Sequence, residues 1–131
     1  AATREYLQAD RGERQLNKVL EMLAVVEATG TLPFAQLIAT DGVRLNRNDT
    51  VLAISADPSP DWAAALQHLQ RRGINSIALV VNGHTFGRPF EYAELLAKLE
   101  TTAVSTYMLH HGEALDAALA TQYRAGAVKP V

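Results

Sequence analysis

The chain has 131 residues, 48% of them apolar and 20% charged, and this balance is typical of one soluble globular domain. The formal net charge of −2 excludes a broad basic surface, so we expect no nucleic-acid partner. The absence of cysteine excludes disulfides and thiolate metal sites. No apolar run is long enough to cross a membrane, and we expect no direct membrane contact from this segment.

The first part of the chain predicts a loose arm and then a helix. Residues 1–9 are expected to be a flexible arm, and the start at Ala1 without a methionine indicates a piece of a larger protein. Asp10 and Glu13 have the spacing of a helix capping pair, and one apolar face continues to about Thr29. The apolar positions of that face are Leu16, Val19, Leu20, Leu23 and Val26.

A shorter helix is expected between Pro33 and Gly42, and the stretch Thr50–Ser55 then predicts the strand around which the rest is arranged. Four consecutive apolar residues in that stretch are typical of a strand covered on both faces. The residues of this run are Val51, Leu52, Ala53 and Ile54. Ser59 and Pro60 follow as a helix cap and a first helical position, so a strand leads directly into a helix.

The same strand-and-helix pattern then repeats. Ser76–Val81 and Val104–Leu109 predict two further buried strands, with helical patterns before and after each. Alternating strands and helices predict an α/β fold, a three-layer sandwich with a short, mostly parallel sheet of about three strands and about five helices. We expect a single domain over residues 10–123 and a frayed tail over 124–131.

Polar residues follow each predicted strand, and parallel strands bring such residues to one edge of the sheet. Asp57, His84 and His110 are the candidates there, and imidazole with carboxylate suits Zn²⁺ or another transition metal, or a phosphate. The alternative is that the loops are simply polar, because no ligand spacing is diagnostic. The loop 82–87 lacks the Lys-Ser/Thr of a P-loop, and Ser55 lacks the glycines of a hydrolase elbow.

Five short motifs, in this order, resemble the C-terminal part of the domain of unknown function 58 family over roughly residues 10–120. They are Asp10-Arg11-Gly12-Glu13, Gly30-Thr31-Leu32-Pro33-Phe34-Ala35-Gln36-Leu37, Val51-Leu52-Ala53-Ile54-Ser55, Arg71-Arg72-Gly73-Ile74, and Tyr107 to Gly112 with Leu115. The resemblance implies a bacterial membrane-anchored protein with a von Willebrand factor A-like, Rossmann-like domain. It also implies a MoxR-type AAA+ ATPase as partner and a location in the cytoplasm or on the cytoplasmic side of the membrane.

The resemblance also bears on a metal site. Domains of the von Willebrand factor A type hold a divalent cation with three loops, and Thr31 matches the second loop while Asp57 lies near the third. The Asp-x-Ser-x-Ser motif of the first loop does not occur in this chain. One hydroxyl and one carboxylate are a poor cage for Mg²⁺, so these positions predict only a degenerate cation site and no resident cofactor.

Two functions therefore remain open. The favoured hypothesis is a non-catalytic protein-interaction or scaffold domain, working with a AAA+ ATPase or another envelope-associated protein. The alternative is a small metal- or nucleotide-dependent enzyme with its site at the carboxyl ends of the strands. An unpaired sheet edge also predicts self-association, either edge to edge or through the helix over residues 11–29.

Overall fold

The computed structural model describes residues 7–8, 10–25 and 30–124. The chain divides into two compact units, Ala1–Leu32 and Pro33–Val131. This boundary lies inside the span 10–123 expected as a single domain, which stays a prediction. The expected arm over 1–9 and tail over 124–131 fall almost entirely outside the described residues.

The N-terminal unit contains helix α1 (Gly12–Val25), none of whose residues is buried. Its Leu16, Leu20 and Leu23 are 56%, 54% and 61% exposed. Short helices gain most of their stability by packing such an apolar stripe against another surface. The predicted helix end near Thr29 lies outside the described residues. Asp10 does not form the predicted capping pair, because its carboxylate accepts a hydrogen bond from the adjacent N–H of Arg11 (2.8 Å).

The second unit alternates helices and strands as the sequence predicts. In chain order its elements are α2 (Phe34–Gly42), β1 (Thr50–Ser55), α3 (Asp61–Arg71), β2 (Asn75–Val81), the 3-10 helix η1 (Gly83–Phe86), α4 (Ala93–Glu100), β3 (Ser105–Leu109) and α5 (Leu115–Ala120). All three predicted strands are confirmed to within one residue at their ends. The predicted cap is one residue off: Pro60 is the N-cap of α3 and Asp61 its first residue, while the Ser59 hydroxyl accepts a hydrogen bond from the Asp61 N–H (3.1 Å) just before the helix.

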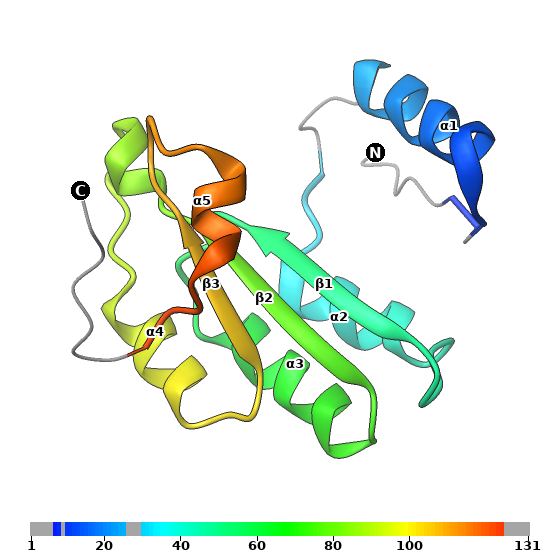
Figure 1. Cartoon of the computed structure of the whole chain (residues 1–131). Coiled ribbons are helices and arrows are strands. Elements are labelled where there is room, and N and C mark those ends of the chain that lie inside the picture. The colour runs from blue at the N-terminus through cyan, green and yellow to red at the C-terminus, as the bar shows by residue number, and fades with distance from the viewer. Residues whose placement is uncertain (1–6, 9, 26–29, 125–131) are drawn as a thin grey trace. The chain divides into compact units, whose positions relative to one another are not determined.

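The sheet has the order β1-β2-β3, and both neighbouring pairs are parallel. In its register Ala53 lies beside Ala78, and Ala78 beside Thr106. Each strand is followed by a helix, which gives the α/β, Rossmann-like arrangement of three layers predicted from the sequence (Figure 1). β2 is the central strand, so β1 and β3 are the two edges.

One face of the sheet carries the main hydrophobic core, beneath α2, α3 and α4 (Figure 1). Trp62, Leu66 and Leu69 project from α3 and are fully or almost fully buried. The Trp62 ring packs edge-on against Phe34 of α2, with ring centroids 5.4 Å apart. Side chains alternate between faces along a strand, so the small Ala78 of β2 lies under this helix layer and allows close approach.

The other face is covered unevenly. Helix α5 contacts β3 on this side, opposite α3 and α4 (Figure 1). Ala118 of α5 is buried there, and Leu79 of the central strand is 4% exposed. On β1, however, Leu52 and Ile54 are 52% and 56% exposed. The expectation that this strand is covered on both faces is therefore wrong, because β1 is an edge strand and α5 reaches only the opposite edge.

In the part of the chain that the structure describes, no helix is both long enough and apolar enough to span a membrane.

Candidate functional site at the carboxyl ends of the strands

The parallel sheet brings the loops after β1, β2 and β3 to one edge, as the sequence predicts. Ser55 at the end of β1 lies beside Val80, and Val81 lies beside Leu109. In open α/β sheets this edge is where ligands usually bind. The chemistry of the edge depends on whether its polar side chains are free to meet a ligand or are occupied within their own loops.

Asp57 is occupied in the loop that joins β1 to α3. The Ser55 hydroxyl accepts a hydrogen bond from the Asp57 N–H (3.0 Å), and the Asp57 carboxylate accepts one from the Ser59 N–H (2.9 Å). The Trp62 indole N–H donates to the Asp57 carbonyl (2.9 Å). These bonds satisfy the backbone of a tight turn and fix the start of α3. These bonds explain why an aspartate is present at position 57, so its presence does not require a ligand.

Tyr92, which the sequence analysis did not single out, joins the first two loops. Its hydroxyl donates to the Ala56 carbonyl (2.6 Å) and accepts a hydrogen bond from the Gly83 N–H (2.9 Å). Gly83 permits this approach, because a Cβ there would lie 2.9 Å from the Tyr92 hydroxyl and 3.0 Å from the Phe90 ring. A tyrosine nine residues after a loop glycine is no specific signal, so only the fold reveals this junction.

The second and third loops are joined through Thr85. Its hydroxyl donates to the Asn82 carbonyl (2.7 Å) and accepts a hydrogen bond from the His111 N–H (2.9 Å). The Asn82 side chain accepts from the His84 N–H (3.1 Å), and the Phe86 ring packs edge-on against the His111 ring at 5.0 Å. The three loops thus form one continuous rim, held by hydrogen bonds within and between them.

His110 turns toward a carboxylate from its own loop. The Glu113 Oε1 accepts a hydrogen bond from the His110 N–H (3.1 Å) and lies 3.5 Å from the His110 Nδ1. Sequence reasoning did not single out Glu113, although a carboxylate three residues after a histidine in a turn is a signal for such a pair. The pair closes the turn between β3 and α5 and supplies two ligands at most.

The predicted metal ligands do not form a recognisable set. The described residues contain no group of three or more His, Asp and Glu side chains that could hold a metal ion. His84 is exposed, whereas Asp57 and His110 are used in their own turns. Thr31, the other position implied by the resemblance, belongs to the N-terminal unit. The edge thus brings the predicted loops together without a shared centre for these side chains.

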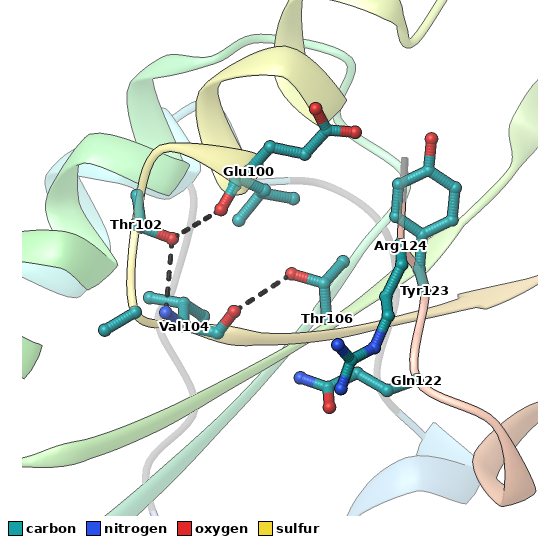
Figure 2. Close-up of a pocket in the computed structure, with 9 residues that line it drawn as sticks. Glu100, Thr102, Val104, Thr106, Gln122, Tyr123 and Arg124 are labelled. Atoms are coloured by element: carbon teal, nitrogen blue, oxygen red, sulfur yellow. Dashed lines mark hydrogen bonds between the residues drawn. The ribbon is translucent and has the colours of Figure 1, made fainter. Parts of the chain in front are cut away.

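A cavity of about 500 Å³ lies elsewhere, near the beginning of β3 (Figure 2). It is lined by Leu99, Glu100, Thr102, Ala103, Val104, Thr106, Gln122, Tyr123 and Arg124. The Tyr123 N–H donates to the Thr106 carbonyl (2.7 Å) and holds the segment after α5 against this edge strand. Figure 2 shows the charged ends of Glu100 and Arg124 on opposite sides of the cavity, so the two groups do not act as a pair. The lining offers no nucleophile with an adjacent base.

Comparisons with known proteins add no relative, since no family model, no curated protein and no solved structure matches the chain. The resemblance to the domain of unknown function 58 family therefore stays a prediction that depends on the order of the motifs.

Proposed function

We propose that this chain is a non-catalytic protein-interaction or scaffold domain. The observation that carries the proposal is the apolar surface on the α5 side of the sheet. Leu52 and Ile54 of β1 are 52% and 56% exposed there, and Leu115 and Leu119 of α5 are 54% and 43% exposed. Parallel sheets are normally covered on both faces, and exposed apolar residues gathered on one side are typical of interaction surfaces.

The strand-end rim supports the same proposal, because its polar side chains do not form a catalytic site. A catalytic site needs two or more polar groups within reach of one reacting atom. Here Asp57, Thr85 and Tyr92 bond to backbone groups of the rim itself. Their positions are explained by the need to hold three loops together, and no specific observation favours the alternative of a metal- or nucleotide-dependent enzyme.

The resemblance supplies the partner class for this proposal, a MoxR-type AAA+ ATPase or another envelope-associated protein on the cytoplasmic side of a bacterial membrane. Such a partner would bury Leu115 and Leu119 of α5, which lie four residues apart on one helical face. A charged side chain at those positions should then prevent binding, because burying an unpaired charge costs several kcal/mol.

The test measures binding of a MoxR-type ATPase by biolayer interferometry, with the full chain immobilised. The double variant Leu115→Glu/Leu119→Glu should lose at least about tenfold in affinity, since 1.4 kcal/mol already corresponds to tenfold. Ala117→Glu is the matched control, because Ala117 is also exposed on α5 but lies away from the two leucines. Equal binding by both variants, or no binding by the unmodified chain, would contradict the proposed role of this surface.

A further inference from the structure

Asn82 and Gly83 form the junction between β2 and η1, and no other asparagine of the chain precedes a glycine. The remaining asparagines are followed by bulkier residues, at Asn17, Asn46, Asn48 and Asn75. Asparagine is chemically labile, because the backbone nitrogen of the next residue can attack its side-chain amide carbon. Glycine has no Cβ and therefore restricts this attack least. The sequence favours the reaction at Asn82 more than at any other asparagine.

The reaction proceeds through a cyclic imide. A base removes the proton from the Gly83 nitrogen, this nitrogen forms a bond to the Asn82 Cγ, and the bond from Cγ to Nδ2 breaks so that ammonia leaves. Water then opens the ring at either carbonyl and leaves aspartate or isoaspartate at position 82. The sum is asparagine plus water giving aspartate or isoaspartate plus ammonia, so no oxidant, reductant or cofactor is needed. The attack requires the Gly83 N–H to be free.

The structure keeps this N–H occupied. Gly83 is buried, and its N–H donates to the Tyr92 hydroxyl (2.9 Å). The Tyr92 hydroxyl is itself held in place, because it donates to the Ala56 carbonyl (2.6 Å) in the loop after β1. A base in solution therefore reaches the Gly83 proton only after the bond to Tyr92 breaks.

Asn82 is also held in an unreactive conformation. Its N–H donates to the Leu109 carbonyl (2.9 Å), and its side-chain oxygen accepts from the His84 N–H (3.1 Å). Its carbonyl accepts from the N–H and the hydroxyl of Thr85 (3.1 and 2.7 Å). With ψ 91°, the Asn82 Cβ and the Gly83 nitrogen lie on opposite sides of the Cα–C bond. Ring closure therefore needs a backbone rotation that these hydrogen bonds oppose.

We infer that Asn82 is a modification site of this chain, where deamidation proceeds through local opening of the rim, and that the Tyr92 hydroxyl controls its rate. A reaction that needs an open form proceeds in proportion to the population of that form, and local opening costs less than global unfolding. The isoaspartate product adds a methylene to the main chain between the bonds to Leu109 and Tyr92, so both bonds no longer fit together. The modification therefore holds the rim open, and refolding does not reverse it.

The first test compares the folded chain with the chain unfolded in urea, both in the same mildly alkaline buffer. Peptide mapping by mass spectrometry measures the loss of asparagine at position 82 with time. In urea Asn82 should react fastest of all the asparagines, and folding should slow it at least about tenfold. A folded chain in which Asn82 reacts as fast as in urea overturns the inference, as does another asparagine that reacts faster in urea.

Tyr92→Phe removes the acceptor of the Gly83 N–H and should raise the rate at Asn82 in the folded chain at least about tenfold, which corresponds to about 1.4 kcal/mol. Val104→Ala is the matched control, because it removes buried side-chain volume at the beginning of β3, the opposite end of the sheet, and keeps the bond to Tyr92. Urea unfolding measures the loss of stability in both variants. If Val104→Ala accelerates the reaction as much for an equal loss of stability, the opening is global and Tyr92 does not control it.

Hydrogen exchange at the Gly83 N–H, measured by nuclear magnetic resonance in the unmodified chain, keeps the inference testable if Tyr92→Phe does not fold. Exchange reports the breaking of the bond to Tyr92. Folding should slow deamidation at least as much as it slows this exchange, because the attack needs both a free nitrogen and rotation about ψ of Asn82. Deamidation that is slowed less than exchange would show that the attack does not require this bond to break, and would overturn the inference.

The modified chain tests the consequence for the rim. It carries an additional negative charge, so anion exchange separates it from the unmodified chain. Chain with isoaspartate at position 82 should melt at a lower temperature than the unmodified chain. Asn82→Asp is the control for the charge alone and should melt closer to the unmodified chain, since its carboxylate can still accept from the His84 N–H. An isoaspartate chain as stable as the unmodified one would contradict an open rim.

Discussion

The Tyr92 hydroxyl should be among the most consequential single atoms of the α/β unit. It donates to the Ala56 carbonyl at 2.6 Å and accepts from the Gly83 N–H at 2.9 Å, while Tyr92 is only 5% exposed. Tyr92→Phe removes both bonds and leaves a buried N–H and a carbonyl without partners. A buried group left unpaired costs about 1–3 kcal/mol, so the free energy of unfolding should fall by about 2 kcal/mol.

For a domain of this size each kcal/mol shifts the melting temperature by about 4–8 °C, which predicts a fall of about 10 °C in a calorimetric scan. Tyr107→Phe is the matched control, because Tyr107 is half-buried on β3 and its hydroxyl has no hydrogen bond among the described residues. It should change the unfolding free energy by less than about 0.5 kcal/mol. If both variants melt alike, the Tyr92 junction does not hold the rim together and the reasoning is refuted.

Three further outcomes follow from the structure. Leu66→Ala, at a fully buried position, should cost about 2–5 kcal/mol in urea unfolding, while the exposed Leu115→Ala should cost less than about 0.5 kcal/mol; similar values would contradict the observed core. Gly73→Ala should destabilise by about 1 kcal/mol or more by the same measurement, because Gly73 has φ +86° and its added Cβ would meet Arg47 at 3.2 Å; Gly30→Ala, with open space around it, should be close to neutral. A thermal-shift series with Mg²⁺, Mn²⁺, Zn²⁺, ATP and inorganic phosphate should leave the melting temperature unchanged, and a rise with any of them would revive the enzyme alternative.

The strands and their order along the chain could be predicted from the sequence, because the signals for a strand are local. The apolar runs after residue 50 depend on neighbouring residues only, and all three appear as strands in the structure. The position of each strand in the sheet is not local. A run such as Val51–Ile54 looks the same whether the strand is central or at the edge, so the sequence could not show that Leu52 and Ile54 lie half exposed.

The sequence predicts where the strand-end site lies, but it does not predict whether the side chains there are free to bind a ligand. Parallel topology is enough to bring the loops that contain Asp57, His84 and His110 to one edge. Whether a polar side chain meets a ligand or a nearby backbone N–H depends on turn geometry within a few residues. Asp57 and Asn82 both accept from the N–H two residues ahead, a local bond that asparagine and aspartate often form in turns and that competes with any ligand.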